Sequence, residues 1–457
     1  MVREAARRVR SGCALINIAS TVGVLGNPKR NASAASKVGL ISLTKSLACG
    51  RVSQGIGGMA VAPGCPHRAS QAICRNTFAA AKRRFRCDRC AGRAHLRRPT
   101  ISKQGNTMEF ATFILAAQRG YHQSSDSVIR NSIEQAVASE QAGFDTAWFA
   151  EHHFNNYSLI PSPLMMVAHC AGLTSTIRLG TAVCVLPLYQ PQRLLSEIGF
   201  ADIVANGRLE LGVGVGYQQF EFERFGVNID EAPAVFSEYL DILLKGLNEN
   251  IFEHDGHYEK IPPTAVSVRT VQKPTPPIWI AGGPARTGRA YRDGHNFFVT
   301  AFHDGVETLS TLRATIEKAA ASKGRNVTDA KISLLRCCYA SHDEAEIISY
   351  LDNARFQRRL SEALHQRRQQ SHDGYLLQET PTQQDLSFET MRKNMPIGSV
   401  NRVIDRLLEE IDILKPDQIA LQTQLGDFDQ NTMLRQIELW GDRIIPAINK
   451  ALDHAQI

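Results

Sequence analysis

From residue 108 onward, short apolar runs alternate with longer stretches in which apolar residues recur every three or four positions. The short runs predict strands at 109–115, 144–150, 177–186, 208–214, 277–281, 296–300, 331–339 and 418–423. The longer stretches predict amphipathic helices at 127–142, 191–205, 233–248, 305–322 and 399–414. Strands that are apolar on both faces and separated by helices are typical of a parallel sheet. Eight such units predict an α/β fold, a (β/α)8 TIM barrel over 108–457.

One segment interrupts the alternation between the seventh and eighth strands. Residues 354–395 are polar and rich in Gln and Arg, and they predict a long helix followed by a flexible loop. Long irregular segments in compact domains often serve as active-site lids. A lid and a solvated appendage are the two interpretations of this insertion.

Charge separates the chain into two parts. Residues 1–107 carry 20 Lys and Arg against 2 Asp and Glu, whereas residues 108–457 carry 32 against 43. We therefore interpret 1–107 as a basic arm and 108–457 as a separate domain. Such an arm attracts nucleic acid or anionic lipid in principle, but no nucleic-acid-reading motif supports that role. Cys87-x-x-Cys90 with His95 has partial zinc spacing without a fourth ligand, so no metal site is predicted.

The basic arm contains remnants of another fold. The stretches Cys13–Ser20, Asn31–Lys37 and Val61–Gly64 resemble the second half of a short-chain dehydrogenase/reductase. Ser20 and Lys37 match catalytic positions of that family, but Ser33 occupies the position of its tyrosine, and the glycine-rich nucleotide turn is missing. The resemblance covers residues 12–65 and implies an inactive fragment. A non-native fusion or a misread gene start is the interpretation we favour for the whole arm.

The apolar runs and the cysteines indicate the cellular compartment of the protein. No apolar run approaches the ~18 residues of a membrane-spanning helix. The four cysteines after residue 107 lie mostly in apolar, strand-like runs, which is typical of core thiols in a reducing compartment. We expect a cytoplasmic protein.

The second predicted strand ends in an acid and two imidazoles, at Glu151, His152 and His153. Barrel chemistry is located at the carboxyl ends of the strands, and polar groups there are costly unless they line a site. Histidine also exchanges its proton close to neutral pH. These residues therefore predict a catalytic site, with a solvated loop as the alternative.

Two glycine motifs indicate where a flat, phosphorylated ligand binds. In the fourth strand Gly212, Gly214 and Gly216 share one face, opposite Leu209, Leu211 and Val213, and this leaves room for a ring. After the fifth strand, Gly282-Gly283 precede a helix that Pro284 opens. The bare N–H groups of that helix end, with Arg286 and Thr287, predict a phosphate site, and an ordinary turn is the alternative.

Several motifs in a fixed order resemble the luciferase-like, flavin-dependent monooxygenase family over residues 108–452. They are Glu151–Phe154, Gly180–Pro187, Gly207–Gly216, Phe225-Gly226, the strand and glycine pair at 277–283, Pro396–Ser399 and Glu438-Leu-Trp440. The resemblance implies an enzyme that takes reduced FMN from a separate NAD(P)H:flavin reductase. With O2 it would oxidise an aldehyde or another small organic molecule. We further expect a homodimer.

The resemblance also implies roles for single residues. His152, with Glu151, would act as a base or hydrogen-bond partner where O2 reacts, and His153 would point to the other side of the strand end. A non-prolyl cis peptide at Ala182–Val183 would contact the flavin ring. The luciferase α subunit has a reactive Cys and an Arg where this chain has Gly214 and Val215, a departure that removes one phosphate ligand and leaves light emission open. The phosphate contact would then fall to Gly282, Gly283, Arg286 and Thr287.

Two other functions are compatible with these residues. Relatives on the same barrel use a deazaflavin and transfer hydride without O2, and some relatives bind flavin without turnover. The absorbance spectrum of the bound cofactor separates the first alternative from FMN chemistry.

Overall fold

The computed structural model describes the two short strands 14–18 and 57–61 and residues 108–120, 123–372, 375–377, 379–422 and 424–454. The chain divides into two compact units, Met1–Ser102 and Lys103–Ile457. In the first unit, strands β1 (Ala14–Ile18) and β2 (Gly57–Val61) pair in parallel. The predictions made for Ser20, Ser33, Lys37 and the Cys87–His95 motif lie outside the described residues.

The second unit is a closed parallel barrel of eight strands. They are β3 (Glu109–Ile114), β4 (Thr146–Phe149), β5 (Arg178–Thr181), β7 (Leu209–Gly214), β10 (Ile278–Ile280), β11 (Asn296–Thr300), β12 (Ile332–Cys337) and β17 (Gln418–Gln422). Each pairs in parallel with its neighbour, and β17 pairs with β3, with Gln418 opposite Glu109, to close the ring. All eight predicted strands are present, so the predicted (β/α)8 barrel is confirmed.

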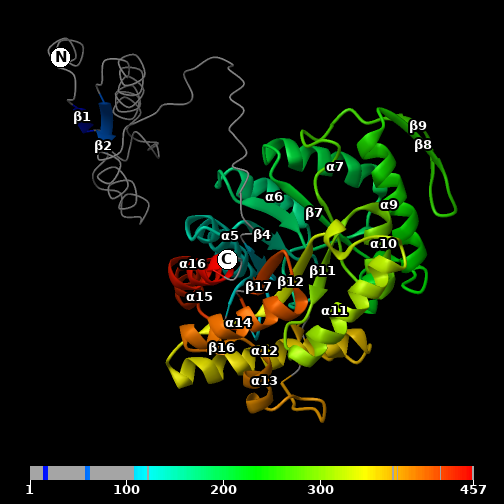
Figure 1. Ribbon diagram of the computed structural model, residues 1–457. Coiled ribbons are helices and arrows are strands. Elements are labelled where there is room, and N and C mark those ends of the chain that lie inside the picture. The colour runs from blue at the N-terminus through cyan, green and yellow to red at the C-terminus, as the bar shows by residue number, and fades with distance from the viewer. Residues whose placement is uncertain are drawn as a thin grey trace. The chain divides into compact units, whose positions relative to one another are not determined.

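Helices cover the outside of the barrel (Figure 1). The predicted ones are α5 (Ser125–Gln141), α7 (Pro191–Val204), α9 (Ala232–Asn248), α11 (Val306–Ala321) and α14 (Val400–Leu414), and each lies within two residues of its expected bounds. The others that flank the strands are α6 (Pro163–Ala171), α10 (Pro284–Asp293), α15 (Gln430–Leu439) and α16 (Ile445–His454). No helix in the described parts of the chain is long and apolar enough to cross a membrane.

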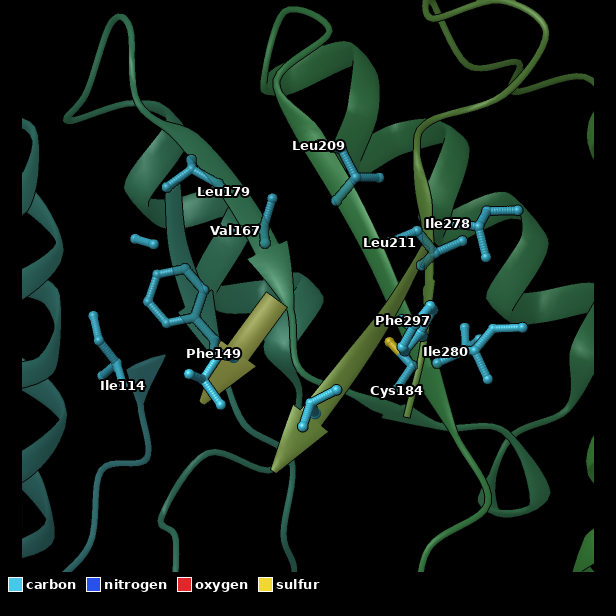
Figure 2. Packing of buried hydrophobic residues seen from close by; sticks show 14 of the residues in the cluster. Ile114, Phe149, Val167, Leu179, Cys184, Leu209, Leu211, Ile278, Ile280 and Phe297 are labelled. Atoms are coloured by element: carbon cyan, nitrogen blue, oxygen red, sulfur yellow. The ribbon is translucent and has the colours of Figure 1, made fainter. Parts of the chain in front are cut away.

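The strands contribute to two apolar layers because their side chains alternate. Leu209 and Leu211 of β7 belong to the layer between the strands and the helices, where Leu211 lies beside Ile278 of β10 (Figure 2). The opposite faces fill the barrel axis, where Trp148 and Trp279 meet edge to face with ring centroids 5.5 Å apart. Both indoles are satisfied, since Trp148 donates to Gln418 (2.9 Å) and Trp279 to Glu210 (2.6 Å). This packed axis leaves space for a ligand only at the carboxyl ends of the strands.

Three segments differ from the predicted pattern. The third strand stops at Thr181, and only Cys184–Val185 (β6) resume pairing, beside β7. An antiparallel hairpin, β8 (Ile251–Asp255) and β9 (Lys260–Ala265), precedes β10 and was not predicted. It was missed because Pro262 and Pro263 sit within its second strand and proline normally argues against strand structure.

The insertion before β17 begins earlier than its polar composition suggested. Helix α12 spans Glu344–His365, and Asp343 caps it by accepting a hydrogen bond from the Ala345 N–H. The first half of α12 carries buried apolar residues that resemble ordinary core sequence. The polar composition therefore did not indicate where the insertion begins. The loop that follows contains a small hairpin, β14 (Ser371–His372) with β15 (Tyr375–Leu376), and helix α13 (Phe388–Asn394).

Candidate active site

A cavity of about 550 Å³ opens at the carboxyl ends of the barrel strands. Eight of the nine sequence-predicted site residues line it, namely Glu151, His152, Ala182, Val183, Gly214, Gly282, Gly283 and Arg286. Thr287 does not line this cavity and is buried in α10. His153 is also absent from the cavity lining, in keeping with its expected direction.

His152 is fixed by a carboxylate from another strand end. Its Nδ1 lies 3.0 Å from Oε1 of Glu221, a residue in α8 (Gln219–Phe225) just after β7. The same Oε1 accepts the backbone N–H of His153 at 2.7 Å. Glu221 has only 1% of its side chain exposed, against 11% for His152. A buried acceptor at Nδ1 fixes the orientation of the ring.

Gln218 supplies a competing donor to the same nitrogen. Asn155 Nδ2 donates to Gln218 Oε1 at 3.1 Å, which turns the Gln218 amide nitrogen toward His152 Nδ1 at 2.9 Å. Nδ1 can donate to Glu221 or accept from Gln218, but not both at once. With the first partner His152 Nε2 carries a lone pair, and with the second it carries a proton. Each tautomer of the His152 imidazole therefore has a hydrogen-bond partner for Nδ1, Glu221 in one case and Gln218 in the other.

Glu151 is fully engaged by hydrogen bonds. Its Oε1 accepts from His153 Nε2 at 2.9 Å, and its Oε2 accepts from Tyr189 Oη at 2.7 Å and from the Val185 N–H at 3.2 Å. Burial raises the pKa of Glu151, while His153 and Tyr189 oppose that rise. Its contacts make Glu151 a brace that connects the loop after β4 to the start of the segment after β5.

One wall of the cavity combines an unusual backbone and a glycine. The Ala182–Val183 peptide bond is cis, as the resemblance implied. A Cβ atom added to Gly214 would lie 2.6 Å from Val183 Cγ2, closer than any normal contact. Glycine at 214 therefore allows β7 to approach Val183. Gly214 and Val183 both line the cavity.

The N-terminus of α10 forms the polar end of the cavity. Gly283 is its N-cap, and a Cβ added there would meet nothing within 4 Å. Gly282 has a φ of 140°, and the Arg286 side chain folds back within 3.0–3.3 Å of its would-be Cβ. None of the ion pairs among the described residues involves Arg286. A helix N-terminus and a guanidinium outside those ion pairs are the usual components of a phosphate site.

Sequence reasoning missed several polar and aromatic residues that line the cavity. Tyr157 and Tyr217 come from the loops after β4 and β7, Glu221 from α8, and Ser361 and His365 from α12. Glu221 follows the glycine-rich strand by a few residues, which is a weak signal. For Ser361 and His365 the only signal was the lid interpretation of the insertion.

Comparisons with known proteins show which family this chain resembles. Residues 108–414 match the family model described as luciferase-like monooxygenase. An uncharacterised protein, y4vJ of Sinorhizobium fredii, is 80% identical over 350 residues, which cover 76% of this chain and 100% of the relative. The oxygenase component of a flavin-dependent trigonelline monooxygenase from Acinetobacter baylyi is 29% identical over 309 residues, covering 66% and 85%.

A solved structure shares the fold. The oxygenating constituent of 3,6-diketocamphane monooxygenase from Pseudomonas putida, in complex with FMN, matches with a TM-score of 0.61 at 19% identity over 75% of this chain and 99% of that one. The chain belongs to the luciferase-like monooxygenase family, whose members are flavin-dependent oxidoreductases. Residues 1–93 match a different model, described as enoyl-(acyl carrier protein) reductase, which is consistent with the dehydrogenase-like fragment.

Proposed function

We propose that this protein is an FMN-dependent monooxygenase that receives reduced FMN from a separate reductase. With an aldehyde as substrate the balanced reaction is FMNH2 + O2 + RCHO → FMN + RCOOH + H2O. Reduced flavin, when bound, would supply two electrons and activate O2 for transfer of one oxygen atom to the substrate. The observation that carries the proposal is a cavity with His152 and Glu221 at one side and the N-terminus of α10 at another.

The residues present fit such a cofactor. A volume of about 550 Å³ is within the range of about 300–1,000 Å³ usual for small-molecule sites. Val183 and Gly214 would support the flat ring, and added bulk at 214 would collide with Val183. Gly282, Gly283 and Arg286 would hold the phosphate, because both the helix end and the guanidinium attract anions.

His152 would handle the proton at the reacting centre. Glu221 leaves Nε2 of His152 unprotonated when it accepts from Nδ1, and Gln218 leaves it protonated when it donates to Nδ1. The imidazole can thus take up or give a proton without leaving its position, the role of a general acid or base. Glu221 and Gln218 would hold the His152 ring in place during both proton uptake and proton release.

Glu151 would position rather than react. Both carboxylate oxygens are occupied by His153, Tyr189 and the Val185 N–H. It holds the loop that carries His152 against the segment that follows the Ala182–Val183 bond. In this proposal Glu151 fixes the distance between the imidazole and the ring wall.

The partners follow from the same proposal. The trigonelline enzyme is named an oxygenase component, which supports a separate NAD(P)H:flavin reductase as the source of reduced FMN. Helices α6 and α7 contact each other, and they and the turn after α6 carry exposed apolar side chains, namely Met165, Leu173, Phe200, Ile203 and Val204. We propose that a second copy of the chain covers them, since clustered exposed apolar residues mark interfaces. Sedimentation of Phe200→Asp should then show a monomer.

Anaerobic titration tests the cofactor assignment. We expect the full chain to bind reduced FMN, and then to consume O2 and convert an aldehyde when air is admitted. Deazaflavin F420 in the same titration is the comparison. Preferential F420 binding, with hydride transfer and no O2 uptake, would replace the monooxygenase with a dehydrogenase. FMN binding without any O2 uptake would favour a non-catalytic flavin protein.

A further inference from the structure

An aromatic wall lies beside His152, and the insertion contributes half of it. The rings of Tyr217 and His365 are stacked, with centroids 3.9 Å apart and planes 16° from parallel. His152 meets Tyr217 edge to face at 5.8 Å and Tyr157 at 4.8 Å. All four rings line the cavity. The insertion therefore completes the site next to the proposed catalytic imidazole.

The tautomer of the His365 ring is set by a contact within its own helix. Its Nδ1 lies 3.0 Å from the carbonyl oxygen of Ser361, one turn earlier in α12. A carbonyl oxygen can only accept, so Nδ1 carries the proton and Nε2 of the neutral ring keeps a lone pair. None of the hydrogen bonds among the described residues uses Nε2 of His365. Stacking on Tyr217 holds the ring in this orientation.

The charges around the cavity disfavour an anionic substrate. The acids that line it are Glu151 and Glu221, both almost wholly buried. Arg286 is the one Lys or Arg side chain among the described lining residues, and it sits at the helix end assigned to the cofactor phosphate. A substrate carboxylate beside the aromatic wall would therefore face acids without a cation to neutralise it.

We propose that the Tyr217–His365 wall recognises an uncharged aromatic substrate bearing a hydroxyl or N–H group, whose proton His365 Nε2 accepts. The inference rests on the proposed function for its chemistry, but binding can be measured independently of turnover. Aromatic rings pack favourably on Tyr157, Phe302 and the edge of the wall, which all line the same cavity. The hydrogen bond to His365 then selects among aromatic molecules of similar size.

Three probes of nearly equal shape separate these contributions. Calorimetry of the full chain, with and without FMN, would give dissociation constants for 3-hydroxybenzaldehyde, 3-methoxybenzaldehyde and 3-formylbenzoate. We expect the hydroxy compound to bind about tenfold more tightly than the methoxy compound, the value of one net hydrogen bond. The carboxylate should bind more weakly than either neutral compound.

Variants of His365 test whether this residue causes the preference for the hydroxy compound. His365→Phe keeps a ring on Tyr217 and removes the acceptor, so the ratio of hydroxy to methoxy affinity should fall to about one while FMN affinity is unchanged. His365→Gln supplies another acceptor and should retain part of the preference. His342→Phe, at an exposed histidine away from the cavity, is the matched control and should keep the full ratio.

Other outcomes overturn the proposal. An unchanged ratio in both His365 variants, tighter binding of the carboxylate, or no binding of the hydroxy compound would each contradict it. Failure to bind FMN, with the three affinities in the expected order, would instead overturn the proposed function and leave the aromatic site in place.

Discussion

Glu221 Oε1 and His152 Nδ1 lie 3.0 Å apart, although 69 residues separate them in the chain. Glu221 belongs to α8 after β7, and His152 follows β4. The barrel brings the two strand ends together, and the pairing places a buried carboxylate behind the imidazole that lines the cavity. This arrangement makes the proton on His152 depend on a residue outside its own motif.

Replacing Glu221 by Gln tests that dependence. Glu221→Gln should bind reduced FMN nearly as well as the wild type, whereas product formation should fall by roughly 10²-fold or more, because an imidazole without its orienting acid loses its tautomer control. Steady-state product assays and FMN titrations measure the two effects. Glu223→Gln, an exposed acid on the same helix, is the control. Equal rates for Glu221→Gln and the control would remove Glu221 from the mechanism.

The two adjacent histidines should behave differently. His152→Ala should still bind reduced FMN but lose product formation by roughly 10²–10⁴-fold, the usual effect of losing a general acid or base. O2 uptake would continue and release H2O2. His153→Ala should lower the melting temperature instead, because it leaves Glu151 without one of its partners. A peroxide assay distinguishes them, and an equal loss of product in both variants would contradict the assignment.

Gly214 should be intolerant of any side chain. Gly214→Leu is expected to abolish FMN binding and leave the circular dichroism spectrum intact, since the added atoms collide with Val183 and enter the proposed ring site. Gly288→Ala is the control, because its Cβ would make only an ordinary 3.7 Å contact with Lys323. Unchanged FMN affinity in Gly214→Leu would locate the ring elsewhere.

Acid should destabilise the barrel through His303. Burial, with Arg358 and Arg336 nearby, lowers the pKa of His303 to about 3. The unfolded chain would bind this proton near the ordinary pKa of 6.5. Neutral His303 therefore makes its full contribution to the free energy of unfolding above about pH 6.5. This contribution is lost as the pH falls toward 3, by up to about 1.4 kcal/mol per pH unit.

Denaturant titrations of His303→Gln measure that contribution. The free energy of unfolding of this variant should depend less steeply on pH between about 6.5 and 3 than that of the wild type. His342→Gln, at an exposed histidine, should keep the wild-type slope. A slope unaltered by His303→Gln would mean that other groups cause the acid sensitivity.

The basic arm should be dispensable for the flavin chemistry. We expect a chain of residues 108–457 to keep the FMN affinity and the melting transition of the full protein. The 80% identical relative aligns with this chain over 350 residues and is covered completely, which supports the prediction. Calorimetry of both chains is the measurement, and a marked loss of either property would give the arm a role in the barrel.

Local pattern alone determined the fold of this protein. The short apolar runs and the helical stretches between them predicted all eight barrel strands, because buried parallel strands and amphipathic helices leave a signal in nearly every residue. The strand-end rule then predicted Glu151, His152, Gly214 and Gly282 around one opening, and all four line the same cavity. These positions follow from topology, since parallel strands bring their carboxyl ends to one rim.

Only the tertiary structure decided the partners of those residues. The sequence marks Glu221, Tyr217 and His365 weakly at best, because a single polar or aromatic residue near a helix end is common in any chain. Their roles arise from distances across the barrel, such as 3.0 Å to His152 and 3.9 Å between Tyr217 and His365. Such contacts depend on strand register and on how α12 packs over the barrel mouth. The sequence pattern does not predict which residues from distant segments come into contact, because those contacts form only when the chain folds.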